Sequence, residues 1–220
     1  MKIILPSNSL ISSIVALSII KCCDCDITIK NEKLKSFSRF YSLNYFSKNF
    51  LESLGVWELL DKSQITPYKK IEIYKNTKKT IEFDASDVNI DYLGYIVNED
   101  QLVKIISNKI FDNQEIKKSE KPILSPGKNM LNIISNHNDI CTAKDSINFT
   151  SKDYSQTAIN MSFQHSEANM GIPRQIFYKD EILGFLPLNN NSYNLIWSMP
   201  NYTFKKIKLL DREEYKPLLN

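Results

Sequence analysis

The chain is poor in glycine, arginine and histidine, and these shortages exclude several classes of function. Five glycines in 220 residues are about a third of the usual ~7%, and the first of them is Gly55. A glycine-rich phosphate loop near the N-terminus is therefore excluded. Only three of the 28 basic residues are arginine, and the net charge is +3. Nucleic-acid-binding proteins gather arginine into a basic patch, so we expect no nucleic-acid partner.

Cysteine and histidine offer no metal-binding or disulfide pattern. Three of the four cysteines are crowded within residues 22–25, and the two histidines lie far from them. Adjacent cysteines do not fit one tetrahedral zinc site, and no second cysteine pair accompanies the C-x-x-C spacing of Cys22 and Cys25. We therefore predict reduced cysteines, as in a cytoplasmic protein, and no bound metal. His137 and His165 are expected at the surface, because no nucleophile motif such as G-x-S-x-G accompanies them.

The remaining composition is that of an ordinary globular chain. Hydrophobic residues make up 42% of it and charged residues 24%, and the mean hydropathy is −0.31. These values argue against a protein with several membrane spans, and the 11% of aromatic residues argues against disorder. A length of 220 residues allows one large domain or two small ones.

The first thirty residues admit two interpretations. Residues 2–5 form an apolar strand pattern, residues 10–21 an apolar helix with Ser9 as its N-cap, and residues 26–29 a second strand. This order is typical of a dinucleotide-binding βαβ unit. The alternative is a secretory signal sequence, since the apolar stretch has the length of a signal core. We favour the βαβ unit, because serines interrupt that stretch and no small-x-small cleavage site precedes the charged residues.

The glycine fingerprint of a dinucleotide-binding unit is absent from this βαβ pattern. Serines Ser7, Ser9 and Ser12 occupy the three places of G-x-G-x-x-G, and Lys30 stands where an acidic residue grips the ribose hydroxyls. A serine side chain occupies space that a phosphate oxygen needs, and a serine with positive φ costs about 1 kcal/mol. We predict that helix N–H groups keep a weak anion attraction while tight dinucleotide binding is lost.

The rest of the chain shows two further helices and a series of strands. Periodicity predicts helices over residues 47–61 and 99–110, and a hairpin over 70–84 with its turn at residues 75–77. Residues 111–129 are polar and rich in lysine, which predicts a loop or a lysine-decorated edge. An antiparallel meander is expected from four apolar stretches, at residues 157–163, 174–178, 182–188 and 193–198.

Six short motifs occur along the chain, at Arg39–Leu43, Leu51–Trp57, Leu93–Val97, Tyr154–Ala158, Gly184–Leu188 and Leu195–Ser198. They resemble R-x-x-A-L, L-E-x-L-G-x-W, L-G-Y-x-V, Y-x-Q-T-A, a-L-L-P-L and L-V-W of one family, in the same order and with compatible gaps. That family is the ubiquinone-biosynthesis hydroxylases, which are class A flavoprotein aromatic monooxygenases. The resemblance covers residues 2 to about 199.

The resemblance implies an α/β fold built from two parts. A Rossmann-like FAD-type domain is expected from residues 1–68 and 94–150, an antiparallel-sheet substrate domain from 69–93 and 154–199, and a tail from 200–220. In that family NAD(P)H reduces the FAD, and the flavin hydroperoxide hydroxylates a phenolic ring beneath the sheet. The third flavin signature does not follow the last strand, so we expect the C-terminal part of the family fold to be missing.

Some of the family's flavin-side residues are retained in this sequence, and others are replaced. Arg39 matches the family arginine that lies near the flavin. Asp145 matches the aspartate of the second flavin signature, whose glycine and arginine are not retained. Asp100 stands where the family has an arginine, two residues before Leu102, which inverts the local charge. We therefore assign no catalytic residue and expect FAD binding to be impaired.

These observations leave three hypotheses for the function. The chain is a truncated FAD- and NAD(P)H-dependent hydroxylase of a polyprenyl-phenol, a non-catalytic partner in a quinone-biosynthesis assembly, or a gene remnant. In the second case it would join other proteins of that assembly, or its own copies, through its exposed sheet. We expect a cytoplasmic protein. Lysine pairs at residues 69–70 and 78–79 would permit peripheral contact with anionic lipid at the inner membrane, although a solubilising surface is the preferred interpretation.

Overall fold

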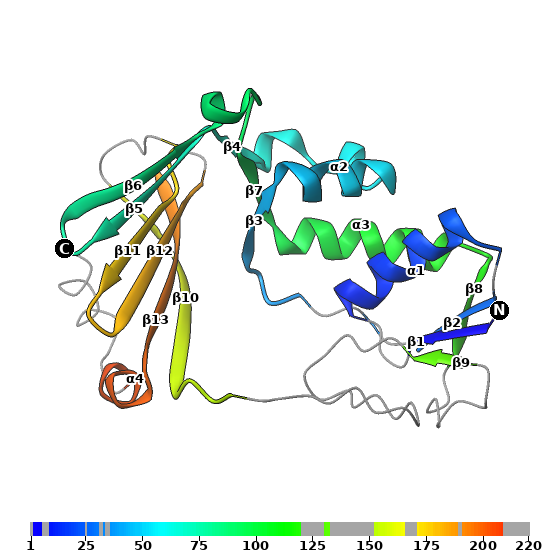
Figure 1. Ribbon diagram of the computed structural model, residues 1–220. Coiled ribbons are helices and arrows are strands. Elements are labelled where there is room, and N and C mark those ends of the chain that lie inside the picture. The colour runs from blue at the N-terminus through cyan, green and yellow to red at the C-terminus, as the bar shows by residue number, and fades with distance from the viewer. Residues whose placement is uncertain are drawn as a thin grey trace. The chain divides into compact units, whose positions relative to one another are not determined.

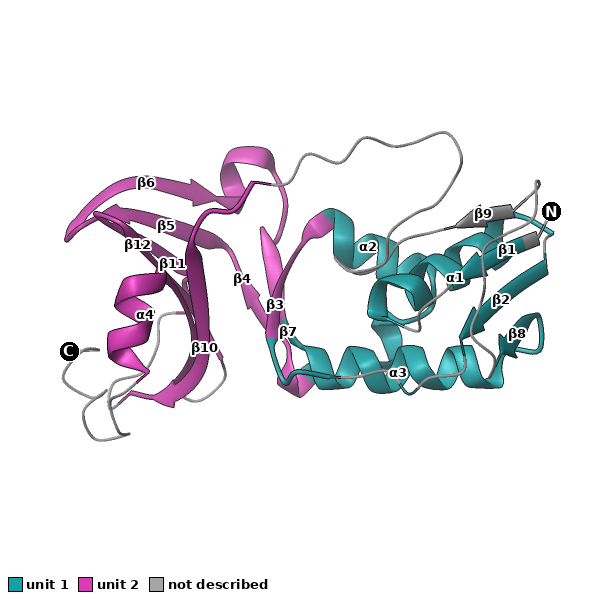
Figure 2. Ribbon diagram, turned by 90° about the horizontal axis from the view of Figure 1, so that it is seen from below, with its two compact units in different colours: residues 1–39, 46–62, 97–150 teal, residues 40–45, 63–96, 151–220 magenta. Residues whose placement is uncertain are grey.

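The chain folds into two compact units. The computed structural model describes residues 2–5, 9–24, 26–30, 33, 36–119, 130–132, 152–165, 171–188 and 191–208. Unit 1 comprises residues 1–39, 46–62 and 97–150, and unit 2 comprises residues 40–45, 63–96 and 151–220 (Figure 2). Both units are discontinuous in sequence, because the chain leaves each of them and later returns.

Unit 1 contains a four-stranded parallel sheet of order β8-β2-β1-β9 (Figure 1). Its strands are β1 (Lys2–Leu5), β2 (Asp26–Lys30), β8 (Ile116–Ser119) and β9 (Met130–Asn132). Helix α1 (Leu10–Cys22) connects β1 to β2, so the predicted βαβ unit is confirmed. Leu5 pairs with Ile29, and the carboxyl ends of β1 and β2 therefore meet at one edge of the sheet.

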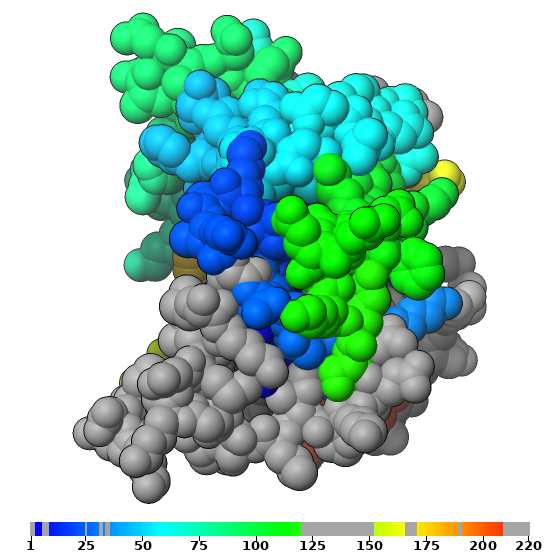
Figure 3. Space-filling view, turned by 90° about the vertical axis from the view of Figure 1, so that its right-hand side faces the viewer, coloured from blue at the N-terminus to red at the C-terminus, as the bar shows by residue number. Residues whose placement is uncertain are grey.

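Helix α1 packs through small residues. Its buried side chains are Ser12, Ser13 and Ala16, which lets the helix backbone lie close to its neighbours. Helix α3 (Glu99–Asp112) packs against α1, and the two lie side by side in Figure 3 (blue and green). Helix α1 is 13 residues long, and no helix within the described part of the chain is long and apolar enough to span a membrane.

The structure corrects one sequence prediction in unit 1 and decides between the alternatives of another. The helix predicted over residues 47–61 is shorter: α2 spans Tyr45–Ser53, because Gly55 adopts φ +62° and the amide of Val56 bonds back to the carbonyl of Leu51 at 2.9 Å, a helix-terminating pattern. Two 3-10 turns follow, Trp57–Leu59 and Lys62–Gln64. Residues 111–129, predicted as a loop or a lysine-decorated edge, include the end of α3 and strand β8. Strand β8 carries two lysines and lies at the edge of its sheet, so the second alternative is correct for residues 116–119.

Unit 2 begins with a three-stranded sheet of order β3-β7-β4. Its strands are β3 (Phe40–Asn44), β7 (Gly94–Asn98) and β4 (Thr66–Tyr68). The side chain of Tyr68 lies against Gly94, and its hydroxyl is 2.8 Å from that of Ser42. A side chain at position 94 would collide with this phenol and with the carbonyl oxygen of Leu43, so only glycine fits here.

The larger sheet of unit 2 has six strands in the order β10-β13-β12-β11-β5-β6 (Figure 1). They are β5 (Lys70–Lys75), β6 (Lys78–Asp84), β10 (Gln156–Gln164), β11 (Arg174–Tyr178), β12 (Glu181–Pro187) and β13 (Ser192–Pro200). The predicted hairpin over 70–84 is confirmed. The predicted antiparallel meander is correct for β11, β12 and β13. Strand β10 is also antiparallel, but it pairs with β13 and not with β11. Strand β5 pairs with β11 in the parallel direction. The sheet is therefore mixed, which is possible because a long crossover separates β5 from β11.

Helix α4 (Asn201–Ile207) covers one face of this sheet. Its Ile207 joins Leu195, Trp197 and Met199 in a buried apolar cluster. Partly buried side chains surround the cluster, namely Ile159, Met161, Phe163, Leu183, Phe185 and Phe204. Because side chains alternate between faces along a strand, residues 182, 184, 186 and 196 lie on the opposite face.

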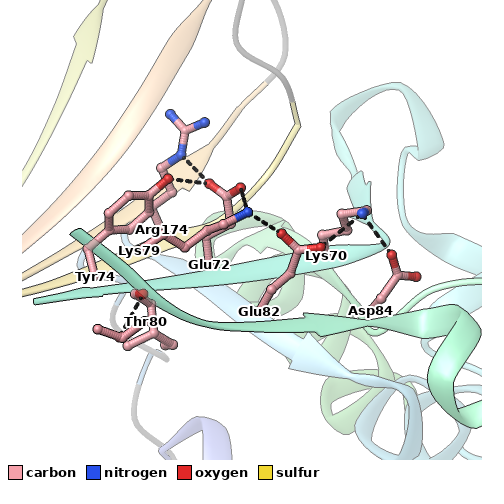
Figure 4. A network of polar contacts seen from close by, with 9 residues as sticks. Lys70, Glu72, Tyr74, Lys79, Thr80, Glu82, Asp84 and Arg174 are labelled. Carbon is pink, nitrogen blue, oxygen red and sulfur yellow. Dashed lines mark hydrogen bonds and ion pairs between the residues drawn. The ribbon is translucent and has the colours of Figure 1, made fainter. Parts of the chain in front are cut away.

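A chain of charged side chains crosses β11, β5 and β6 on the same face as the cluster (Figure 4). Glu72 is buried and accepts hydrogen bonds from Arg174 Nε at 2.9 Å and from the hydroxyl of Tyr74 at 2.9 Å. Lys79 lies 3.4 Å from Glu72 and also pairs with Glu82. The chain continues to Glu82 and Asp84, which share Lys70 at 3.0 and 2.9 Å. The network ties the β5–β6 hairpin to β11.

We expect this network to weaken in acid. Burial alone would raise the pKa of Glu72, but hydrogen bonds from Arg174, Tyr74 and Lys79 outweigh it and hold that pKa below the ordinary value of 4.5. A carboxylate whose pKa is lowered by folding contributes stability above its unfolded pKa, and the contribution is lost as pH falls through the folded pKa. Thermal unfolding followed by circular dichroism should therefore show a loss of stability below about pH 4.5.

Glu72→Gln is the matched variant for this prediction, since the amide keeps an oxygen for Tyr74 but no longer titrates. The stability gap between the wild-type chain and Glu72→Gln should stay constant from neutral pH down to about 4.5 and shrink as the pH falls below that value. A gap that stays constant below pH 4.5 would contradict the assignment.

Candidate functional site

The candidate site lies in unit 1, at the edge where β1 and β2 end and α1 begins. Ser9 is the N-cap of α1, and its Oγ accepts a hydrogen bond from the backbone amide of Ser12 at 3.1 Å. The hydroxyl of Ser9 also donates to the hydroxyl of Ser12 at 3.2 Å, and Ser12 is fully buried. In a phosphate-binding βαβ unit the first helix amides point to the ligand. Here the chain's own cap occupies the amide of Ser12.

Lys30 is the last residue of β2, next to the carboxyl end of β1. An ammonium group donates hydrogen bonds and accepts none. Lys30 therefore cannot accept hydrogen bonds from ribose hydroxyls as a carboxylate would at this position. The two other positions named from the sequence, Ser7 and Asp145, lie outside the described residues.

Arg39 is held by a buried carboxylate at the start of α3. Glu99 has a side chain that is only 3% exposed, and its Oε1 lies 2.7 Å from Arg39 Nη2. Its Oε2 accepts from Arg39 Nε at 3.3 Å, from the amide of Phe37 at 2.8 Å and from the amide of Arg39 at 3.3 Å. The guanidinium therefore makes a fork-shaped pair with Glu99.

Asp100 also binds the segment of residues 36–39 to the N-terminus of α3. Its carboxylate accepts from the hydroxyl of Ser38 at 3.1 Å and from that of Ser36, and Ser38 adopts φ +51°. The side chain of Asn98 caps α3 through the amide of Asp100 at 2.6 Å. Two carboxylates in the first turn suit the positive end of the helix dipole. Residues 36–39 are thus folded over the N-terminus of α3.

These residues do not fit a bound FAD. The guanidinium of Arg39 is paired with Glu99, and Asp100 binds the same segment through Ser36 and Ser38. These three charged side chains together carry a net negative charge, which repels a diphosphate. Ser9 caps the helix amide that a phosphate would need, and Lys30 offers no acceptor to a ribose. Among the described residues, the groups at these cofactor-side positions are satisfied by, or replaced with, groups of this chain. We derive no reaction step through FAD.

Among the described residues, Glu99 holds the Arg39 segment and was not singled out from the sequence. The sequence marked Asp100 as a charge inversion, but the residue before it makes more hydrogen bonds to the Arg39 segment. The available signal was its position, directly after Asn98, at the junction of strand and helix. A carboxylate there faces the chain segment that precedes the neighbouring strand β3.

Solved structures share this fold. PqsL, a probable FAD-dependent monooxygenase from Pseudomonas aeruginosa, matches with TM-score 0.70 and 12% identity over 94% of this chain and 62% of that chain. HpxO of Klebsiella pneumoniae, complexed with FAD and uric acid, matches with TM-score 0.63 and 12% identity over 91% and 56%. A variant of 2-methyl-3-hydroxypyridine-5-carboxylic acid oxygenase gives 0.62 and 13% over 91% and 59%.

The fold is that of the FAD-dependent monooxygenases. The chain spans less than two thirds of the length of each of these structures. No family model matches it. The identities are too low to carry substrate or activity from one protein to another, so the fold alone is established, and FAD is the cofactor named for the neighbours.

Part of the face opposite α4 on the six-stranded sheet of unit 2 is apolar. Residues Ile71 and Ile73 of β5 pair with Phe83 and Ile81 of β6, on the face away from the buried Glu72. Ile81 and Phe83 are about half exposed, at 49% and 52%. Across the sheet the same face carries Ile182, Leu186 and Ile196, with Gly184 between them. This part of the face offers apolar side chains to a hydrophobic ligand.

Proposed function

We propose that this chain is a non-catalytic binding protein of quinone biosynthesis, built on the monooxygenase fold, that does not hold FAD by itself. The observation that carries the proposal is the pairing of Arg39 with the buried Glu99, beside Asp100. A position expected to attract the cofactor is occupied by the chain's own carboxylates. Such pairing fixes residues 36–39 and leaves the guanidinium charge neutralised.

The ligand class we propose is a polyprenyl-phenol. The resemblance to ubiquinone-biosynthesis hydroxylases suggests the class, and the apolar sheet face around Gly184 supports it. A prenyl chain has no hydrogen-bonding groups, so it gains free energy by covering exposed apolar side chains such as Ile81 and Phe83. A phenolic head can be placed at the polar end of this face, where the exposed Ser162 lies.

The first test is a titration of the purified full chain with FAD. We expect the protein to be colourless as purified, and calorimetry to show no saturation at micromolar FAD. Asp100→Asn should strengthen any residual FAD binding, because it removes one of the two opposing carboxylates. Asp112→Asn is the matched control: it makes the same charge change at the other end of α3 and should leave FAD binding unchanged.

The second candidate function is the hydroxylase itself, which the retained fold and Arg39 favour. It would use FAD, with NAD(P)H as reductant, to hydroxylate a polyprenyl-phenol. A yellow protein, or saturation at micromolar FAD, would overturn the non-catalytic proposal and establish this candidate as the better one. Equal FAD affinity of Asp100→Asn and Asp112→Asn would overturn the electrostatic explanation.

A further inference from the structure

The two edges of the six-stranded sheet in unit 2 differ in charge. Strand β6, at one edge, reads KKTIEFD, and its charged residues take part in the network with β5. Strand β10, at the other edge, reads QTAINMSFQ over nine residues and has no charge and no proline. Natural sheets protect their edges with charges, proline or short strands. The β6 edge has such protection, and the β10 edge lacks it.

The outer side of β10 has no partner strand among the residues that the structure describes. Hydrogen bonds at its two ends show which residues face outward: His165 N donates to Asn191 O at 2.8 Å, and Asn201 N donates to Ser155 O at 3.0 Å. Because bonded pairs alternate along an antiparallel ladder, odd-numbered residues bond β13. The outward-facing backbone groups belong to Gln156, Ala158, Asn160, Ser162 and Gln164, and all five residues are exposed.

We propose that β10 pairs with β10 of a second copy of this chain, antiparallel and about a two-fold axis at Asn160. The two six-stranded sheets would then form one continuous sheet. Each of the five outward-facing residues would donate one backbone hydrogen bond and accept one. The proposal concerns an edge of unit 2 and is independent of whether the chain binds FAD.

The sequence of β10 is complementary to itself in this register. On the face opposite α4, Asn160 meets its own copy, Ala158 meets Ser162, and Gln156 meets Gln164. On the α4 face, the opposed pairs are Ile159 with Met161 and Thr157 with Phe163. Small neutral groups therefore face small neutral groups, and apolar side chains extend the cluster of α4 across the axis. Like charges directly opposed would destabilise such a pair, and β10 has none.

A second copy is the occupant that these observations favour. An unrelated strand would need a complementary pattern of its own, whereas the two-fold register supplies one for every residue of β10. The geometry is also the ordinary one for homodimers, in which the same surface of both subunits forms the contact. The uncharged edge would otherwise be an aggregation hazard.

Sedimentation velocity of the full chain at increasing concentration tests the proposal. We expect the wild-type mass to rise from 25.5 kDa to twice that value. Asn160→Lys and Asn160→Asp each place two like charges opposite one another at the axis, so each variant alone should dimerise at least about tenfold more weakly. An equal mixture of the two variants should regain the dimer, because opposite charges then face one another.

Two further variants separate the edge from the fold. Ala158→Pro removes an outward-facing amide while leaving the bonds to β13 in place, so it should also yield a folded monomer by circular dichroism. Thr80→Lys adds the same charge to the β6 edge and should dimerise like the wild type. The proposal is overturned if the wild type stays monomeric throughout, if Asn160→Lys dimerises like the wild type, or if the edge instead binds a different protein in place of its own copy.

Discussion

Replacing Gly94 with alanine should destabilise unit 2 by about 3 kcal/mol, at the upper end of the usual cost of overpacking. The added methyl group would lie far inside contact distance of the Tyr68 phenol and of the Leu43 carbonyl oxygen. A side chain can swing away, but a backbone carbonyl of the neighbouring strand β3 moves only with its sheet. We expect the Tm in thermal unfolding to fall by roughly 6–12 °C.

Gly184→Ala is the matched control for this substitution. Gly184 also lies in a strand, but an added methyl group there would be 3.7 Å from its nearest neighbour, the carbonyl oxygen of Ile196. We expect the Tm of Gly184→Ala to stay near the wild-type value. Adding Tyr68→Phe to Gly94→Ala should recover only part of the loss, since the Leu43 oxygen remains. Equal stability of Gly94→Ala and Gly184→Ala would contradict the steric argument.

Glu99→Ala should destabilise unit 1 by about 2–4 kcal/mol. The substitution leaves the amides of Phe37 and Arg39 without their acceptor and the guanidinium without its fork-shaped partner. Arg39 is about half exposed, so water can solvate the freed charge. The cost therefore comes mainly from the two amides that lose their acceptor and from the loosened segment 36–39. Urea unfolding followed by circular dichroism measures it.

Glu99→Gln separates shape from charge at this position. Glutamine keeps one acceptor oxygen for the amides but loses the negative charge and half of the fork, so its cost should be less than half of that of Glu99→Ala. Glu115→Ala, at an exposed position after α3, is the control for loss of an acid alone and should be nearly neutral. If Glu99→Ala proved as mild as Glu115→Ala, the buried carboxylate would not be the organising group of this segment.

Local patterns in the sequence predicted the individual elements well. The β5–β6 hairpin could be predicted from the alternation of Ile71 and Ile73 with polar residues and from the turn that follows them. The Ser9 cap and the apolar stretch after it are sufficient for α1. The predicted helix over 47–61 failed at its second half, because one glycine in a left-handed conformation ends α2. The apolar periodicity of the sequence continues past Gly55, but the helical backbone ends before it.

Pairings between distant segments were not accessible to the same reasoning. The parallel pairing of β5 with β11 could not be predicted from either strand, because an alternation of apolar and polar residues indicates a strand but not which strand it pairs with. For the same reason the sequence marked Arg39 and Asp100 separately and missed Glu99, the residue that joins the Arg39 segment to α3. The predictions that involve Ser7 and Asp145 fall outside the described residues and stay predictions.

The parallel contact of β5 with β11 has a consequence for the order of folding. Glu72 and Arg174 are 102 residues apart, and the chain between them builds a large part of unit 1. During synthesis the β5–β6 hairpin is complete long before β11 leaves the ribosome, while β11, β12 and β13 follow one another and can assemble locally. Closing contacts of such sequence separation is the slow part of folding. Docking of the finished hairpin onto the late meander should therefore limit the rate at which unit 2 folds.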